Sequence, residues 1–230
     1  MKYNNIINGR FISRPNRFIA HIDINGCEEV CHVKNTGRCR ELLIPGAEVF
    51  LQISDNPNRK TRYDLIGVKK KNLMINMDSQ IPNKVVEEWL KSNNILFQNP
   101  KIRPEKTYGK SRFDFYVEDG ERKAFIEVKG VTLEDGGVAS FPDAPTERGI
   151  KHIKELQQSV QDGYEAYLFF VIQMKGIHKM QPNWERHAEF GTALVDAVQN
   201  GVKVLAYDCL VTADSIQIDK PVPVDLGEVK

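Results

Sequence analysis

Short segments in the first 80 residues alternate apolar and polar side chains, which is the period of a strand with one buried face. They cover residues 18–24, 29–33, 49–53, 62–68 and 73–75. The Asn25-Gly26 pair predicts a tight hairpin turn between the first two segments. About five short strands at regular spacing predict a small barrel, and an OB-like β-barrel is the form that we favour.

The period changes after residue 81. Val85, Val86, Trp89 and Leu90 recur at helical spacing, and Asn83 is the expected N-cap of this helix. The charged residues between them lie on the other faces of the predicted helix. The chain therefore leaves the barrel pattern here and begins a different kind of domain.

The rest of the chain mixes the two periods. Strands are predicted around residue 96 and at 112–118, 123–129, 167–173 and 202–207, and helices at 144–161 and 184–199. Asp119-Gly120 joins two of the strands as a hairpin, and Asp143 is the expected N-cap of the helix at 144–161. This order predicts an α/β domain with a mixed sheet. We expect two domains, residues 1–81 and residues 82–230.

Apolar runs and cysteines narrow the class of protein. No apolar run is long enough for a transmembrane helix, and the N-terminal residues do not have the pattern of a signal peptide, so we expect a cytoplasmic protein. Cys27, Cys31 and Cys39 lie close to His32, which raises the possibility of zinc. Their spacing contains no CxxC pair, and residues 28–33 alternate as a strand does. Buried or half-buried thiols are the better interpretation, also for Cys209.

Charge is distributed unevenly although the net charge is only +1. Residues 1–112 contain 20 Lys and Arg against 11 Asp and Glu, whereas residues 113–230 contain 12 against 20. A basic half beside an acidic half suits an enzyme that binds phosphates with one part and a cation with the other. Chance segregation of solvated charge is the alternative.

Two predicted strands joined by the hairpin carry the candidate chemistry. Glu127 and Lys129 are two residues apart, so they point to the same face of a strand, and Asp114 lies on the neighbouring strand between two phenylalanines. Two acids and a lysine would then meet on an otherwise apolar sheet. A solvated β-face is the competing interpretation of the short Glu-Val-Lys sequence.

Phosphodiester hydrolysis requires such a set. Asp114, Glu127 and the carbonyl of Val128 would bind Mg²⁺ or Mn²⁺, and the metal would lower the pKa of a bound water. Lys129 would position that water and offset the charge that develops on the phosphate. Asp114, Glu127 and Lys129 are therefore the candidate catalytic residues.

Cationic and polar side chains elsewhere are candidates for contacts with nucleic acid. Arg148, His152 and Glu155 would share one face of the helix at 144–161, opposite an apolar face. The segment 33–40 would form a loop with three cations, which is either a solvated turn or a contact to phosphates. The full predicted set is Arg17, Lys34, Asn35, Arg38, Arg112, Arg148, Lys151 and His152.

The candidate residues match a known pattern. Asp114 followed by Glu127-Val128-Lys129 resembles the PD-(D/E)xK nuclease signature, with Phe113 where the signature has proline. Over essentially its whole length, the chain resembles the sugar fermentation stimulation protein A family. The segments that carry this resemblance are Arg14-Pro15-Asn16-Arg17-Phe18, His32-Val33-Lys34-Asn35-Thr36-Gly37-Arg38, Ser111-Arg112-Phe113-Asp114-Phe115, Glu127-Val128-Lys129-Gly130-Val131-Thr132, Phe141-Pro142-Asp143-Ala144-Pro145-Thr146-Glu147-Arg148-Gly149 and Lys151-His152.

The resemblance implies an N-terminal OB-like domain, a PD-(D/E)xK-like domain, DNA binding and, by its motif, a Mg²⁺-dependent nuclease. Nuclease relatives can also carry a glutamate on the first helix, for which Glu87 and Glu88 are both candidates. We therefore expect a metal-dependent nuclease that cuts DNA or RNA. The alternative is a non-catalytic DNA-binding protein that regulates sugar-utilisation genes, although no helix-turn-helix or zinc finger is recognisable.

Overall fold

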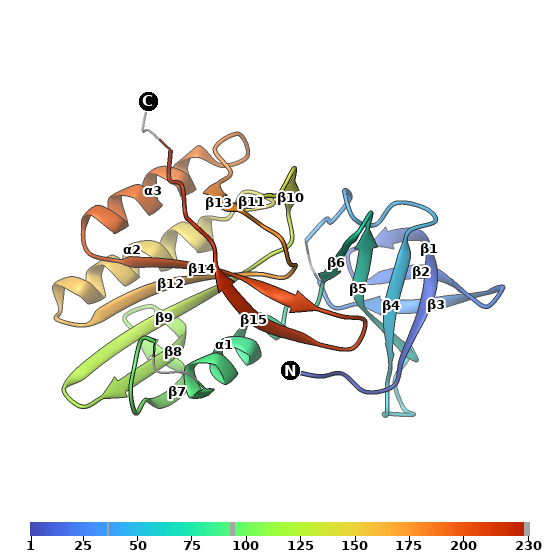
Figure 1. The fold of residues 1–230 in the computed structure, drawn as a ribbon, viewed down its shortest axis with the longest axis horizontal. Coiled ribbons are helices and arrows are strands. Elements are labelled where there is room, and N and C mark those ends of the chain that lie inside the picture. Colours follow the sequence, from blue (N-terminus) through green and yellow to red (C-terminus); the bar gives the residue numbers. More distant parts are fainter. Residues whose placement is uncertain (36, 93–94, 228–230) are drawn as a thin grey trace.

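A β-barrel and a larger sheet-and-helix domain lie side by side in the structure, a computed structural model (Figure 1). It describes residues 1–230 except 36, 93–94 and 228–230. Within this part of the chain, no helix is long and apolar enough to cross a membrane.

The barrel contains the strands β1 (Ile6–Asn16), β2 (Ile19–Ile24), β3 (Cys27–Val33), β4 (Glu48–Ile53), β5 (Tyr63–Lys70) and β6 (Leu73–Asn76). Its sheet has the order β3-β2-β1-β4-β5-β6, and a parallel pairing of β3 with β5 closes it. The hairpin between β2 and β3 has Asn25-Gly26 at its turn, as the sequence predicts. The predicted OB-like barrel is confirmed.

Strand β1 is the element of the barrel that the sequence pattern does not predict. It pairs with β2 on one side and with β4 on the other, and its register shifts between Phe11 and Ser13 and again between Ser13 and Asn16. Such irregularities bend a strand, so that one strand can serve both sides of a closed sheet. They also interrupt the alternation of buried and exposed residues, which removes the period that identifies a strand.

The second domain, here called the sheet domain, consists of α1 (Ile81–Ser92), β7 (Lys101–Tyr108), β8 (Ser111–Asp119), β9 (Arg122–Val131), β10 (Glu134–Asp135), β11 (Val138–Phe141), α2 (Glu147–Gln161), β12 (Glu165–Ile172), β13 (Lys179–Pro182), α3 (Ala188–Gln199), β14 (Lys203–Val211) and β15 (Ile216–Pro221). The main sheet has the order β15-β14-β12-β9-β8-β7. Strands β9, β12 and β14 are parallel, and the outer strands are antiparallel. The predicted mixed sheet is confirmed.

Some local predictions are wrong in this domain. The segment around residue 96 is not a strand, and β7 and β15 are additional edge strands. Helix α2 begins at Glu147, and its N-cap is Thr146, whose side chain accepts a hydrogen bond from the Gly149 N–H. Asp143 is therefore not a cap. Asn83 lies inside α1, and its side chain is used elsewhere.

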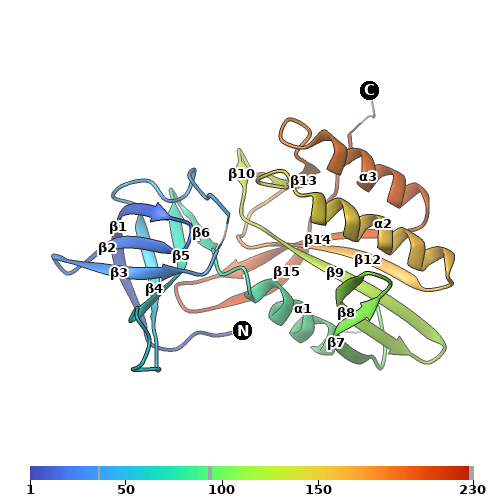
Figure 2. The ribbon, with the colours of Figure 1, turned by 180° about the vertical axis from the view of Figure 1, so that it is seen from behind.

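Helices cover both faces of the main sheet (Figures 1 and 2). Helix α1 packs with one buried cluster, which includes Val86, Trp89 and Phe169. Helices α2 and α3 pack with the other cluster on the opposite face. Strands β9, β12 and β14 are thereby buried on both faces, which explains the almost unbroken apolar sequence of β12.

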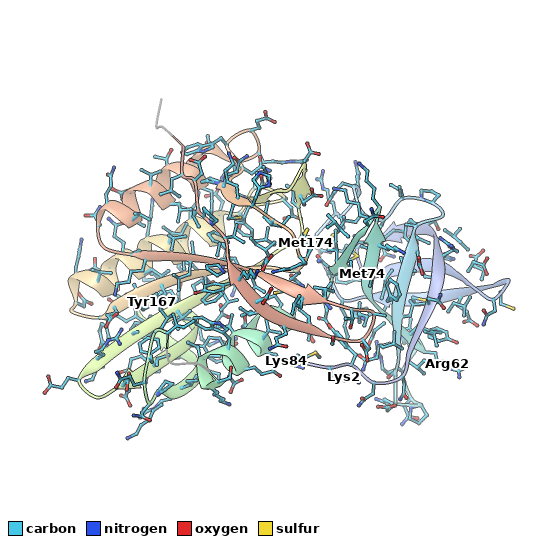
Figure 3. All side chains as sticks on the ribbon, viewed as in Figure 1. Lys2, Arg62, Met74, Lys84, Tyr167 and Met174 are labelled. Atoms are coloured by element: carbon cyan, nitrogen blue, oxygen red, sulfur yellow. The ribbon has the colours of Figure 1, made fainter. Side chains whose placement is uncertain are left out.

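Polar contacts join the two domains. Gln173, directly after β12, donates hydrogen bonds from Nε2 to the Asn76 carbonyl at 3.1 Å, to Asn76 Oδ1 at 2.9 Å and to the Asp78 carbonyl at 3.1 Å. Side chains such as Met74 and Met174 fill the region around this junction (Figure 3). A Cβ on Gly130 would lie 2.5 Å from Gln173 Oε1 and 2.7 Å from Pro82 Cγ. The end of β9 is therefore packed tightly against the junction.

The cysteines are thiols in different environments. Cys31 and Cys39 are buried in the barrel core, and burial raises the pKa of each thiol to about 12. Cys27 is exposed, and Cys209 is buried in the sheet domain. Two of the three clustered cysteines therefore serve as small apolar side chains of the core.

Candidate metal and nucleic-acid site

Asp114 lies at the point where β8 and β9 separate. The ladder between these strands runs from the pair Asp119 and Arg122 to the pair Phe115 and Ile126, and ends before Asp114. Beyond it, Asp114 Oδ2 accepts a hydrogen bond from the Val128 N–H at 2.7 Å. The Asp114 carboxylate thus takes the place of a backbone carbonyl as the hydrogen-bond acceptor for β9. This bond fixes the position of Asp114 relative to that strand.

The other oxygen of Asp114 is held from α1. Asn83 Nδ2 donates a hydrogen bond to Asp114 Oδ1 at 2.7 Å. The first helix therefore contributes an amide to the site. Glu87 forms an ion pair with Lys91 at 2.6 Å, and Glu88 binds the N-terminal amine at 2.7 Å. Neither glutamate has a described contact with Asp114. The residue of α1 that contacts Asp114 is Asn83 instead.

Glu127 and Lys129 lie on one face of β9, as the spacing predicts. Lys129 Nζ lies 2.5 Å from Glu127 Oε1, and both side chains are largely buried. The same Oε1 accepts a hydrogen bond from His152 on α2. The second oxygen, Oε2, is buried without a hydrogen-bond partner. A buried carboxylate oxygen normally has a partner, so this atom has unused capacity to bind a ligand.

His152 does not lie on an exposed cationic face, because its ring is buried and bonded within the protein. Arg148 Nε donates to His152 Nε2 at 3.3 Å, so Nε2 is the acceptor and the proton resides on Nδ1, which donates to Glu127. His152 is only 5% exposed. The buried stripe of α2 passes through this histidine because its other members are Gly149, Ile153, Leu156 and Ser159.

The two carboxylates differ in their proton affinity. Burial, together with the nearby charge of Glu127, raises the pKa of Asp114 above its ordinary value, despite the hydrogen bonds from Val128 and Asn83. Burial alone would also raise the pKa of Glu127. The hydrogen bonds from His152 and Lys129 and the charge of Lys129 outweigh burial and lower it. Glu127 is therefore held as an anion, whereas the charge of Lys129 does not outweigh the effect of burial on Asp114.

The donor atoms fit a hard divalent cation. Among the residues that the structure describes, no three His, Cys, Asp or Glu side chains are grouped as a ready metal site. The site offers two carboxylates and a backbone carbonyl instead. The N–H and C=O of one strand residue point the same way, so the Val128 carbonyl faces the gap that Asp114 occupies. Oxygen ligands of this kind suit Mg²⁺, Mn²⁺ or Ca²⁺, and the unpartnered Glu127 Oε2 could complete the set.

The predicted nucleic-acid contacts fall into two groups. Lys34 lies between two buried acids, 3.5 Å from Asp64 Oδ2 and 3.4 Å from Asp78 Oδ2. Asn35 is also used internally, because its amide donates to the Met77 carbonyl and accepts from the Gly37 N–H. These two side chains shape the loop and are not free to bind phosphates. The remaining residues of the set are exposed on the surface: Arg17, Arg38, Arg112, Arg148 and Lys151.

Two family models match successive parts of the chain. Residues 12–77 match the SfsA N-terminal OB domain, and residues 80–215 match the sugar fermentation stimulation protein RE domain. The chain belongs to the sugar fermentation stimulation protein family. The resemblance seen in the sequence is therefore confirmed at the level of the family.

Individual members of the family are similar over nearly their full length. A sugar fermentation stimulation protein homolog of Desulfitobacterium hafniense (strain DSM 10664 / DCB-2) is 62% identical over 229 residues, which is 99% of this chain and 100% of the relative. A homolog of Clostridium beijerinckii is 61% identical over 218 residues, covering 95% of this chain and 96% of the relative.

A solved structure has the same fold. The structure of Pyrococcus furiosus SfsA in complex with Ca²⁺ superposes with a TM-score of 0.85 at 27% identity, and covers 98% of each chain. The arrangement of a barrel followed by a mixed-sheet domain is therefore shared. The calcium ion in that complex is a property of the Pyrococcus protein.

Proposed function

We propose that this protein is a divalent-metal-dependent nuclease that hydrolyses phosphodiester bonds in DNA or RNA, with Asp114, Glu127 and Lys129 as its catalytic residues. The observation that carries the proposal is Glu127, a buried glutamate held as an anion with one oxygen unpartnered beside a second buried acid. A buried arrangement of this kind costs stability unless something binds to it.

Asp114, Glu127 and the Val128 carbonyl would hold the cation, Mg²⁺ or Mn²⁺. When bound, such an ion polarises the phosphate and lowers the pKa of a coordinated water, which supplies a nucleophile near neutral pH. The Ca²⁺ in the complex of the Pyrococcus relative supports a divalent cation in this fold, since Ca²⁺ and Mg²⁺ both prefer oxygen ligands.

The protein's own side chains hold these ligands in place. Asn83 and the Val128 N–H grip the two oxygens of Asp114, one from a helix and one from a strand. His152 binds Oε1 of Glu127 and leaves Oε2 available, while Arg148 fixes the tautomer of His152. Positioning groups of this kind set the orientation of ligands and commonly affect activity 10- to 100-fold, as an order-of-magnitude estimate.

Lys129 is the cation of the site. Its ammonium lies within hydrogen-bond distance of Glu127 Oε1, and the side chain is 16% exposed, so it is not fully enclosed. From this position, Lys129 would hold an attacking water and offset the negative charge that develops on the phosphate. Gly130, the next residue, lies in the wall of a cleft between the domains.

A cleavage panel tests the proposal. Purified protein is incubated with plasmid, single-stranded DNA and RNA in Mg²⁺ or Mn²⁺, with EDTA in a parallel series. We expect cleavage of at least one substrate, its loss in EDTA, and its loss in Asp114→Ala and Lys129→Ala proteins that still bind nucleic acid. Glu87→Ala is the matched control, because this acid of α1 pairs with Lys91 and should be dispensable. Failure of the wild type to cleave all three substrates would reject the nuclease function.

A non-catalytic DNA-binding protein that regulates sugar-utilisation genes is the second candidate. One observation favours it: Oε1 of Glu127 is already engaged by Lys129 and His152, which is also how a purely structural glutamate is stabilised. This function requires binding without turnover. It would be supported if the wild type bound DNA tightly while the cleavage panel remained negative with both metals.

A further inference from the structure

A groove on the barrel is lined by arginines. It has a volume of about 630 Å³ and runs beside the bent strand β1 and the loop that follows β3. Arg14, Arg17, Arg38 and Arg40 line it, and no aspartate or glutamate does. We call this feature the arginine groove. A concave surface with cations alone attracts a polyanion.

The arginines of the groove differ in their contacts. Arg14 donates four hydrogen bonds to backbone carbonyls, those of Arg17 and Asn35 at 2.7 Å and those of Gly37 and Arg38 at 2.8 Å. It thereby ties the β1–β2 turn to the loop after β3. Arg17, Arg38 and Arg40 are exposed and form no ion pair within the described part of the chain. Three unneutralised guanidiniums are thus held in one groove.

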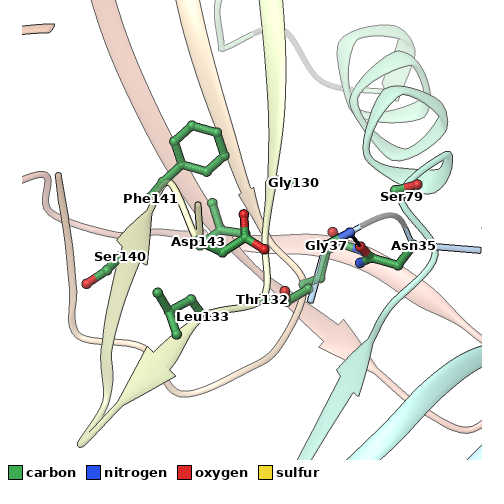
Figure 4. A pocket seen from close by; sticks show the side chains of 11 residues that line it. Asn35, Gly37, Ser79, Gly130, Thr132, Leu133, Ser140, Phe141 and Asp143 are labelled. Carbon is green, nitrogen blue, oxygen red and sulfur yellow. Dashed lines mark hydrogen bonds between the residues drawn. The ribbon is translucent and has the colours of Figure 1, made fainter. Parts of the chain in front are cut away.

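Two smaller hollows adjoin the arginine groove on the side of the sheet domain. The first, of about 150 Å³, shares Arg38 and Arg40 with the groove, and Arg186, Glu41 and Asp143 also line it. The second, of about 180 Å³, is the cleft between the domains, and Asp143 lines it as well. It shares Gly37 with the groove, and Gly130 forms part of its wall (Figure 4). Hollows with common wall residues therefore extend from the barrel surface to Gly130, the residue after Lys129.

Apolar side chains beside the groove favour an unpaired strand over a duplex. Phe18 is 46% exposed and Ile44 is 56% exposed. The Arg17 guanidinium lies 5.0 Å from the centre of the Phe18 ring. Exposed aromatic rings combined with cations bind single strands, because unpaired bases stack on the ring while phosphates bind the cations. The bases of a duplex are not available for such stacking.

From these observations, we propose that the arginine groove binds single-stranded nucleic acid and guides it toward the site at Asp114, Glu127 and Lys129. The route to the site rests on the proposed nuclease function, whereas binding in the groove does not. The two can therefore fail separately.

Binding of a fluorescently labelled 16-nucleotide oligo(dT) to the full-length protein in EDTA tests the groove without cleavage. We expect the triple variant Arg17→Ala, Arg38→Ala, Arg40→Ala to bind about 10-fold more weakly or worse, with the slope of log K against log salt reduced by about 2. Phe18→Ala should weaken binding by about 5-fold or more through lost stacking. The matched control removes three exposed cations of the barrel outside the groove: Lys60, Arg62 and Lys71.

Arg62 makes this control stringent, because its guanidinium also lies over an aromatic ring, 5.5 Å from the centre of Tyr63. We expect the control to retain binding within about 2-fold, apart from a small change in salt dependence. Equal weakening in both triple variants would overturn the groove as the site. Tighter binding of the matched duplex would overturn its assignment to a single strand. Normal binding in EDTA without cleavage in Mg²⁺ would leave the groove supported and reject only the nuclease function.

Discussion

Two buried clusters of charge in this molecule are built from similar residues and have opposite properties. In the barrel, Asp64 is 3% exposed and is surrounded by cations. Arg59 binds its two oxygens at 2.6 and 2.7 Å, and His32 binds Oδ1 at 3.0 Å. Lys34 lies 3.5 Å from Oδ2. Burial would raise the pKa of Asp64, but these partners outweigh it and lower the pKa.

The cluster in the sheet domain is short of partners. Two acids, Asp114 and Glu127, share Lys129 as the cation close to them. The pKa of Asp114 is raised, and Oε2 of Glu127 is buried without a hydrogen bond. In the barrel cluster, by contrast, every oxygen of the acid is engaged.

The difference separates a structural role from a binding role. A buried acid whose oxygens are all satisfied holds its neighbours in place and has little left to offer a ligand. A buried acid with too few partners lowers the stability of the protein, and binding of a cation restores that stability. The comparison therefore predicts that Asp64 supports folding and that Asp114 and Glu127 support function.

Replacing Asp114 should have the largest effect. We expect Asp114→Ala to reduce the cleavage rate on the order of 1000-fold, because a ligand of the cation is lost in a low-dielectric site. Steady-state cleavage in Mg²⁺ measures this. Circular dichroism should show a folded protein at the same temperature, and a variant that cleaves at the wild-type rate would refute the role of Asp114.

Replacing Asp64 should lower stability and leave cleavage nearly unchanged. We expect Asp64→Asn to lower the free energy of unfolding by about 3 kcal/mol, because Arg59 and Lys34 lose their counterion. Urea denaturation measures the change. Cleavage per folded molecule should stay within about 2-fold of the wild type, which is within the range of a distant substitution. A large loss of cleavage without a loss of stability would contradict the structural role.

His152 should give an intermediate effect. His152→Ala removes the donor that positions Glu127, and we expect a 10- to 100-fold loss of cleavage, as an order of magnitude, and weaker Mn²⁺ binding by calorimetry. His152→Asn places an amide donor there and should recover part of both losses. If the two variants behave alike in Mn²⁺ binding, His152 does not act through Glu127.

Acidity should affect the two aspartates in opposite directions. The folded-state pKa of Asp64 is below the ordinary value of 3.8, so the stability that Asp64 contributes is present above that value and is lost as the pH falls below it. The pKa of Asp114 is above 3.8, so ionisation of Asp114 destabilises the protein as the pH rises through that higher value.

Denaturation of the two Asn variants between about pH 3 and pH 7 measures both effects. The advantage of the wild type over Asp64→Asn should shrink below about pH 4. Asp114→Asn should be more stable than the wild type near neutral pH and lose that advantage toward about pH 4. Parallel curves for the two variants would show that the two clusters do not differ.

The sequence predicts the parts of the site that depend on local periods. Alternation along β9 places Glu127 and Lys129 on one face, and the Asp119-Gly120 turn brings the strand of Asp114 alongside. The prediction of the long apolar strand β12 and the resemblance to the family are also confirmed. Each of these follows from a period of two or from a turn of a few residues.

The contributions of the helices depend on packing and were not predicted. The roles of His152 and Asn83 depend on which face of a helix meets the sheet. A wider apolar stripe that included the small residues Gly149 and Ser159 would have placed His152 on the buried face of α2. No local signal identifies Asn83 as the partner of Asp114, because 31 residues separate them. Lys34 was predicted to be a surface cation because its two acidic partners come from distant segments.

Anomalous diffraction from crystals soaked in Mn²⁺ tests the central claim most directly, because both clusters are present in the same molecule. We predict a peak bounded by Asp114, Glu127 and the Val128 carbonyl, and none at Asp64, whose oxygens are engaged by Arg59, His32 and Lys34. A saturated soak without a peak at Asp114 and Glu127, or with an equal peak at Asp64, would contradict the claim that the unsatisfied cluster is the metal site.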